Sequence, residues 1–158
     1  MSYKTPKIDE AFYLVLSGED DLGVVIRAQI HVESSLNDFI IKKISDLKTL
    51  RQLRFNQRID LACELGLNSE LKYPLKMLGD LRNDFAHKLD TTLSKEKVDS
   101  FHKAFDEKTK VFFQTAYEAT ESEMLKEMPN FSDLCPKDKF GIMATILKAR
   151  VVVELSRI

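Results

Sequence analysis

The sequence has no tryptophan and few of the residues that interrupt helices or form covalent cross-links: 5 glycines, 4 prolines and 2 cysteines among 158 residues. Cys63 and Cys135 are far apart and outside any Cys-x-x-Cys pattern, so no disulfide framework is indicated, and two isolated thiols fit a reducing cytoplasm. Uncharged runs such as residues 11–18 are much too short to span a bilayer. Residues 1–8 lack the apolar stretch of a signal peptide. We therefore expect a cytoplasmic protein without a membrane segment.

Charge of one sign is also lacking, because 24 basic and 25 acidic residues give a formal net charge of -1. Such a chain has no general attraction for nucleic acid or acidic membranes, so any such binding must come from a local cluster. His31, His87 and His102 do not have the spacing of metal ligands. We find no glycine-rich phosphate loop and no nucleophile motif, and we expect neither a metal nor a cofactor.

Apolar residues recur at helical spacing almost throughout the chain, and this predicts one all-α domain, residues 1–158, of about six helices. The expected helices cover residues 8–16, 22–44, 55–65, 70–89, 94–116 and 139–156. The second is expected to start behind Asp20 and Asp21, and the fifth at Ser94. Residues 123–136 are expected to be irregular, with a turn at 129–130.

The last expected helix is apolar on every side of its axis, which indicates burial all round. In a domain of this size the helix is either central in the core or part of a homodimer contact, since two-fold dimers are the commonest oligomers. Its apolar residues are Phe140, Ile142, Met143, Ile146, Leu147, Val151, Val152, Val153 and Leu155.

Polar side chains interrupt the apolar stripes of two expected helices. Gln29, Glu33 and Asn37 lie at i, i+4 and i+8 in the middle of the stripe of the second helix, and Arg82 lies in that of the fourth. Buried charges are normally paired. We therefore predict that these helices pack together and that Glu33 meets Arg82, with Gly79 allowing a close approach. The pair is either an architectural salt bridge or part of a polar pocket between the helices.

Asn83 and His87 share a different face of the fourth helix, because His87 points ~140° away from Arg82 on an ideal helix. This face also carries carboxylates. A histidine beside carboxylates can act as a general acid or base near neutral pH, or it can be a solvated surface residue.

Residues 42–58 form a locally basic segment with six basic side chains and one acidic side chain. They can contact phosphates in a salt-dependent way, or form a solvated helix junction balanced by the acidic residues of 118–127. The candidate nucleic-acid contacts are Lys42, Lys43, Lys48, Arg51, Arg54 and Arg58.

Four runs of the sequence, residues 23–39, 58–62, 65–67 and 74–87, together resemble the mannitol operon repressor family. The likeness extends over about residues 10–158. That family is all-helical, is named for repressing bacterial mannitol-utilisation genes and has no recognised DNA-binding motif; likewise, this chain has no helix-turn-helix with a basic recognition helix. The resemblance implies a transcriptional regulator that acts through the basic segment or a protein partner. We expect it to be a homodimer.

The hexapeptide of residues 82–87, Arg-Asn-Asp-Phe-Ala-His, also resembles the Arg-x4-His signature of HEPN domains. These are helical bundles, many of which are metal-independent ribonucleases that work as dimers. The likeness implies that Arg82 would stabilise a phosphate, Asn83 would help to position it and His87 would act as acid or base. The alternative function is therefore a ribonuclease or toxin-like module, although a core position for Arg82 argues against catalysis. A scaffolding bundle without catalysis is a third alternative.

Overall fold

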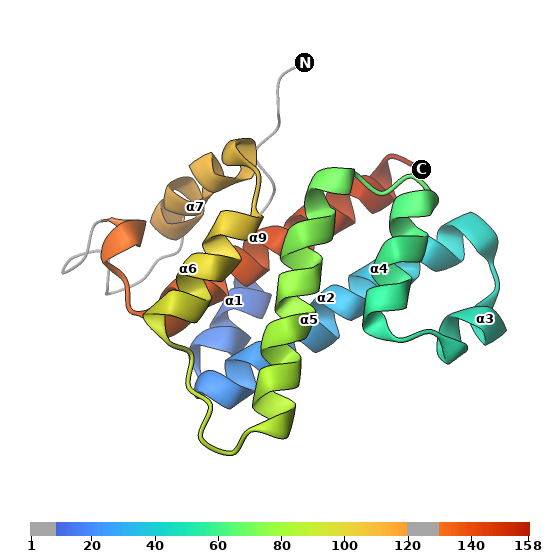
Figure 1. The fold of residues 1–158 in the computed structure, drawn as a ribbon. Helices are drawn as coiled ribbons and strands as arrows, with labels where there is room; N and C mark the ends of the chain where they lie inside the picture. The colour runs from blue at the N-terminus through green and yellow to red at the C-terminus, as the bar shows by residue number, and fades with distance from the viewer. Residues whose placement is uncertain (1–8, 120–129) are drawn as a thin grey trace.

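The computed structural model describes residues 9–119 and 130–158, which form eight α-helices and two short 3-10 turns (Figure 1). These residues contain no β-strand, so the predicted all-α class is confirmed. The elements are α1 (Glu10–Ser17), α2 (Asp21–Ile44), α3 (Leu47–Gln52), α4 (Phe55–Glu64), η1 (Ser69–Leu71), α5 (Lys72–His87), α6 (Lys95–Ala104), α7 (Glu107–Ala119), η2 (Phe131–Asp133) and α9 (Pro136–Ser156).

Side-chain caps fix the starts of several helices. The Asp20 carboxylate accepts a hydrogen bond from the Gly23 amide at 2.7 Å, and the Ser94 hydroxyl accepts one from the Lys97 amide at 3.3 Å. These bonds satisfy first-turn amides that have no partner inside the helix. The helix starts expected behind Asp20 and at Ser94 are therefore confirmed.

Two elements differ from the expected ones. The single helix expected over residues 94–116 is two helices, because Asp106 accepts the Thr109 amide at 3.0 Å and caps a new helix, α7. The short helix α3 was not expected; Asp46 caps it by accepting the Thr49 amide at 3.1 Å. Within the stretch expected to be irregular, residues 123–129 lie outside the described residues, and residues 131–133 form η2.

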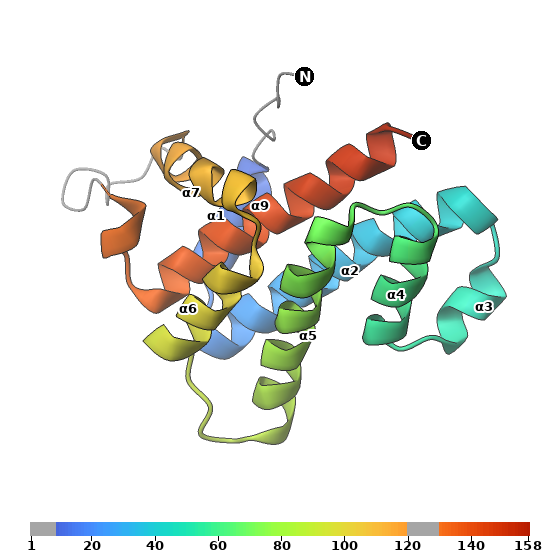
Figure 2. The same cartoon turned by 45° about the horizontal axis from the view of Figure 1, so that its top comes forward.

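Helix α9 is central to the fold. It lies along α2 and also packs against α1, α6 and α7, so that neighbours cover it on several sides (Figure 2). This environment explains a helix that is apolar all round. Near its C-terminal end Val152 is 44% exposed. Its buried residues are Phe140, Gly141, Ile142, Met143, Ala144, Thr145, Ile146, Leu147, Ala149, Arg150, Val151 and Glu154.

Helices α4 and α5 both pack against α2 and against each other, at the end of the bundle away from α7 (Figure 1). The predicted packing of the second expected helix on the fourth is therefore confirmed. Gly79 makes a close approach possible, but to α4 rather than α2: a Cβ at Gly79 would lie 3.0 Å from Phe55 Cδ1. This contact fixes where the start of α4 meets α5.

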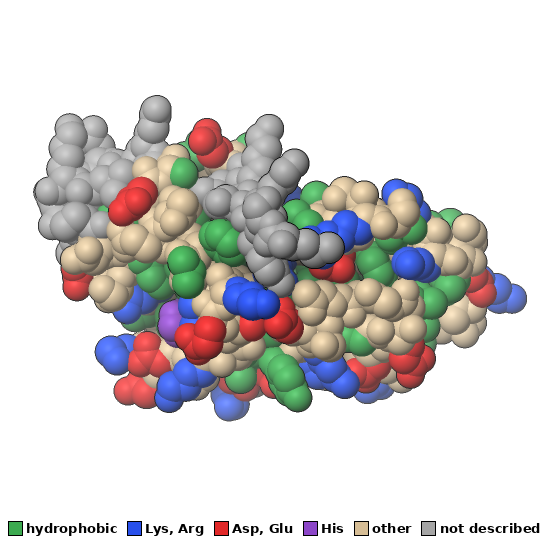
Figure 3. Space-filling view, turned by 90° about the horizontal axis from the view of Figure 1, so that it is seen from above, with side chains coloured by type: hydrophobic (Ala, Val, Ile, Leu, Met, Phe, Trp, Pro, Cys, Tyr) green, Lys and Arg blue, Asp and Glu red, His purple; other side chains and the backbone are tan. Residues whose placement is uncertain are grey.

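Charges of both signs are interspersed on the face seen from above in Figure 3, which offers a polyanion no surface of one sign. None of the helices within residues 9–119 and 130–158 combines the length and apolar character that crossing a membrane requires.

Candidate functional site

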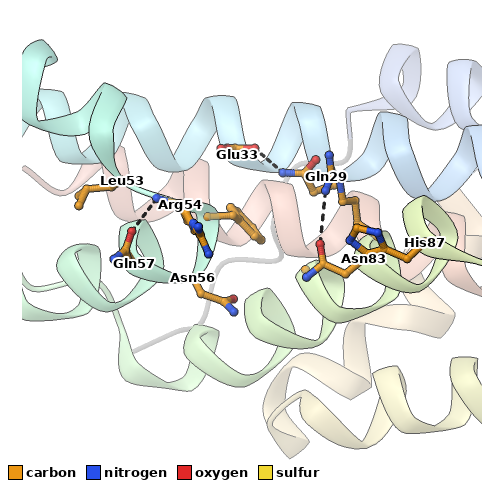
Figure 4. Close-up of a pocket in the computed structure, with 11 residues that line it drawn as sticks. Gln29, Glu33, Leu53, Arg54, Asn56, Gln57, Asn83 and His87 are labelled. Atoms are coloured by element: carbon orange, nitrogen blue, oxygen red, sulfur yellow. Dashed lines mark hydrogen bonds between the residues drawn. The ribbon is translucent and has the colours of Figure 1, made fainter.

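An open pocket of about 760 Å³ lies where α2, α5 and the start of α4 meet (Figure 4). Helix α2 contributes two polar residues to it, the α3–α4 junction and the first turn of α4 form one wall, and α5 forms the other. The lining residues are Gln29, Glu33, Leu53, Arg54, Phe55, Asn56, Gln57, Gly79, Arg82, Asn83 and His87.

The predicted ion pair between Glu33 and Arg82 is wrong. Glu33 Oε1 accepts a hydrogen bond from Arg58 Nη1 of α4 at 2.8 Å. Arg82 is exposed, and its Nη1 donates to the Oδ1 of its neighbour Asn83 at 3.3 Å. Arg82 therefore lines the pocket instead of joining α2 to α5.

The reason lies in how far α4 covers α5. Leu75 and Leu78 are completely buried on the apolar stripe of α5, and Arg82 continues the same stripe one turn beyond Leu78. Helix α4 begins at Phe55, whose ring lies against Gly79. Past that point the stripe opens into the pocket, so a charged side chain at residue 82 reaches water.

The polar residues of α2 form an interhelical network around Arg58 instead. Arg58 Nη1 also donates to Asn37 Oδ1 at 3.2 Å, Arg58 Nε donates to the Leu53 carbonyl at 3.0 Å, and the Gln29 amide donates to Glu33 Oε2. The side chains of Arg58 and Glu33 are only 16% and 24% exposed. A shielded, multiply hydrogen-bonded pair of this kind stabilises a fold more than a surface ion pair does.

A signal for this partner was present in the sequence. Phe55, Arg58, Ile59 and Ala62 lie at i, i+3, i+4 and i+7, so Arg58 interrupts the apolar stripe of α4 just as Glu33 interrupts that of α2. Arg58 is thus a structural charge of α4 and not a surface charge of the basic segment.

The pocket that results is cationic. Arg54 and Arg82 are both exposed, and neither has an ion-pair partner among residues 9–119 and 130–158. Glu33 is the one carboxylate among the lining residues, and Arg58 already neutralises it. An anionic ligand that enters the pocket therefore meets two guanidinium groups without displacing an existing ion pair.

His87 and Asn83 line the same pocket as Arg82. The helical projection separated His87 from Arg82, but the pocket is wide enough to include both, and Figure 4 shows Asn83 and His87 projecting together from α5. No residue of the described chain hydrogen-bonds the His87 ring. Both ring nitrogens are thus available to a ligand.

The first part of the basic segment points away from this pocket. Lys42 Nζ donates to the Leu155 carbonyl at the end of α9, at 3.4 Å. Lys43 Nζ lies 5.8 Å from the ring centroid of Phe39 and beside Gly66, which follows the far end of α4. These two lysines therefore occupy a different part of the surface from Arg54.

The second part of the segment is also divided. Lys48 and Arg51 are exposed on α3, Arg54 enters the pocket, and Arg58 is held in the ion pair with Glu33. The six candidates do not form one nucleic-acid surface, and Arg58 is not available as a contact. These residues are close in the sequence but lie on different parts of the surface, because the chain changes direction at α3 and again at the start of α4.

The other two histidines lie outside the pocket. The His31 ring packs against Phe12, with centroids 4.8 Å apart, and burial, followed by the charge of Lys148, lowers the pKa of His31. His102 packs against Phe113 with centroids 5.5 Å apart, and burial lowers its pKa as well. The described residues contain no group of three or more histidine, cysteine or acidic side chains placed to hold a metal ion.

Comparisons of the chain with family models, with curated proteins and with solved structures find no match.

Proposed function

We propose that this chain is a regulator of gene expression, of the mannitol operon repressor kind, that holds a nucleic-acid phosphate in the pocket between α2, α4 and α5. The observation that supports this most is the charge of the pocket. Arg54 and Arg82 are exposed without ion-pair partners among the described residues, while Glu33 is neutralised by Arg58.

The chemistry of these side chains suits a phosphate. A guanidinium group presents parallel N–H donors that match two phosphate oxygens, and the Asn83 amide adds a further donor beside Arg82. Most contacts between proteins and nucleic acids go to the sugar–phosphate backbone, so binding of this kind needs no recognition helix. It fixes position but does not by itself read a sequence.

One pocket supplies few contacts, so a regulator of this kind needs a second binding element. A homodimer would present two pockets to one nucleic acid and raise the overall affinity through effective concentration. A protein partner would serve the same purpose and would supply the sequence specificity. The two free cysteines, Cys63 and Cys135, favour a cytoplasmic setting for such a complex.

Gel retardation with single-stranded and duplex oligonucleotides tests this function. We expect retardation that weakens as salt rises, and about tenfold weaker binding for Arg82→Gln, because a charge-assisted hydrogen bond is lost. Arg51→Gln, an exposed arginine outside the pocket, is the matched control and should bind within about twofold of the unmodified protein. Binding that is insensitive to both salt and Arg82→Gln would exclude the pocket as the contact.

A metal-independent ribonuclease of the HEPN kind is the second candidate, and one observation favours it: Arg82, Asn83 and His87 line one open pocket. His87 would accept the proton of a ribose 2′-hydroxyl, whose oxygen attacks the adjacent phosphorus while Arg82 stabilises the added negative charge. The bond from phosphorus to the 5′-oxygen then breaks, which leaves a 2′,3′-cyclic phosphate and a 5′-hydroxyl.

Binding is better supported than cleavage because the leaving 5′-oxygen also needs a proton. Among the described lining residues, only His87 and Glu33 could transfer a proton, and Glu33 is held by Arg58, so a water molecule would have to supply that proton. Incubation of RNA with the protein in a chelator distinguishes the candidates. Cleavage that His87→Ala abolishes, with binding retained, would select the ribonuclease; intact RNA would select the regulator.

A further inference from the structure

We propose that Arg54 and Arg82 act as a two-point clamp for a ligand with two phosphate groups, so that Arg54 and the first turn of α4 provide a second phosphate position. This inference rests on the proposed binding function of the pocket. Arg54 and the first turn of α4 lie outside the hexapeptide of residues 82–87. Arg54 belongs to the basic segment of residues 42–58.

The two arginines come from opposite walls of the pocket. Arg54 precedes the first residue of α4, and Arg82 lies near the end of α5 (Figure 4 shows the α4 wall and the α5 residues that face it). The contact between Phe55 and Gly79 fixes the two walls, and Arg82 lies three residues beyond Gly79. Arg82 therefore lies about one helical turn, or ~5 Å along the α5 axis, beyond the point where α4 and α5 touch.

The α4 wall has a feature that suits an anion in addition to the charge of Arg54. A guanidinium group has no acceptor, so the Arg54 side chain does not cap the first-turn amides of α4. The backbone amide of Arg54 itself donates to Gln57 Oε1 at 2.8 Å. The first turn, Phe55 to Gln57, forms the pocket wall with the positive end of the helix dipole. A phosphate beside Arg54 would meet the backbone amides of this first turn as well as the Arg54 guanidinium.

The size of the pocket indicates what joins the two phosphates. A volume of about 760 Å³ is in the range of pockets that hold drug-sized ligands and is larger than two directly linked phosphates need. The ligand that we propose is therefore a pair of consecutive phosphates of a single strand, separated by a nucleoside. A small polyphosphate offers the same chemistry from another source, and the experiment separates the two.

Fluorescence anisotropy with a labelled single-stranded oligonucleotide tests the clamp. Arg54→Gln should weaken binding about tenfold and lower the salt slope of log affinity by about 0.7, the value for one phosphate of a single strand. Arg51→Gln, three residues earlier and outside the pocket, should leave both quantities unchanged within about twofold.

Asn56→Asp gives a readout that a structural role would not produce. A carboxylate in the first turn of α4 favours the helix dipole, so the melting temperature should stay equal or rise. The same charge repels a phosphate at that position, so oligonucleotide binding should fall about tenfold. Lower stability together with unchanged binding would overturn the clamp.

Competition with inorganic pyrophosphate identifies the source of the phosphates. Displacement of the oligonucleotide by pyrophosphate, lost in Arg54→Gln, would support a clamp that takes small polyphosphates; no displacement, with binding still dependent on Arg54, would support a strand. If Arg82→Gln weakens binding but Arg54→Gln and Asn56→Asp do not, the clamp is wrong and the proposed function stands. If none of the three weakens binding, both proposals fail.

Discussion

Arg58 Nη1 lies 2.8 Å from Glu33 Oε1, and this bond determines what the rest of the pocket can do. Because the carboxylate on α2 is already neutralised by α4, the guanidinium of Arg82 on α5 has no partner to meet in the interior. A charge that would otherwise be structural is therefore exposed at the pocket wall. The pairing with Arg58 thus removes the one carboxylate among the lining residues that could have bound Arg82.

Glu33→Ala should lower the free energy of unfolding by about 2 kcal/mol, because it leaves the largely shielded Arg58 guanidinium without its charged partner. Urea denaturation measures the effect. Arg82→Ala is the matched control: it removes a guanidinium that is exposed at the same pocket, and it should change the stability by no more than about 0.5 kcal/mol.

A double-mutant cycle on Glu33→Ala and Arg58→Ala isolates the pair from its surroundings. We expect a coupling free energy of about 1–2 kcal/mol, since the two side chains are in direct contact. The same cycle on Glu33→Ala and Arg82→Ala should give a value near zero. A reversed result would restore the pairing that the sequence suggested.

Gly79→Ala and Gly141→Ala should have opposite effects, although both replace a buried glycine inside a helix. A Cβ at Gly79 would lie 3.0 Å from Phe55 Cδ1, whereas one at Gly141 would lie 3.8 Å from its nearest neighbour, Tyr13 Cε2. Alanine favours a helix by about 1 kcal/mol over glycine, so Gly141→Ala should stabilise the protein by up to about that amount. At Gly79 the crowding should exceed this gain, with a net loss of about 1 kcal/mol.

Thermal denaturation of the two variants checks this comparison. Equal shifts in melting temperature, in either direction, would contradict the tight contact between α5 and the start of α4.

The stability should fall as the pH is lowered from 7.5 to 5.5. Burial, followed by the charge of Lys148, lowers the pKa of His31, so the folded protein binds a proton there less readily than the unfolded chain. The contribution of His31 is therefore complete above the ordinary histidine pKa of about 6.5 and is lost as the pH falls below it. His102 acts in the same direction, because burial lowers its pKa as well.

Urea denaturation at several pH values measures this dependence. In His31→Gln the stability should depend less steeply on pH over that range, whatever the variant loses in packing against Phe12. An unchanged slope in His31→Gln would show that His31 does not contribute to it.

The sequence predicted the helices well where apolar periodicity and capping residues agree, as at α2, whose start behind Asp20 and end at Ile44 both match the structure. It failed where one side chain changes the chain direction. Asp106 divides the expected fifth helix because it caps α7, while the apolar spacing continues through Phe105 and gives no sign of the break.

For the candidate site, the sequence placed Glu33 on the packed face of α2 but predicted the wrong partner for it. Periodicity indicates which face of a helix is apolar, but it cannot indicate how far along that face a neighbouring helix extends. Leu78 and Arg82 share one stripe of α5, yet Leu78 is completely buried and Arg82 is exposed at the pocket. The pocket depends on where α4 starts, which only the tertiary arrangement determines.

Nuclear magnetic resonance of the arginine Nε–Hε groups, during titration of the protein with a short single-stranded oligonucleotide, identifies the arginines that bind phosphate. We expect shifts for Arg82 and Arg54, and almost none for Arg58, which is held by Glu33, or for Arg51, which lies outside the pocket. Shifts confined to Arg51 and other surface residues, with the Arg82 signal unchanged, would contradict the claim that this pocket holds phosphate.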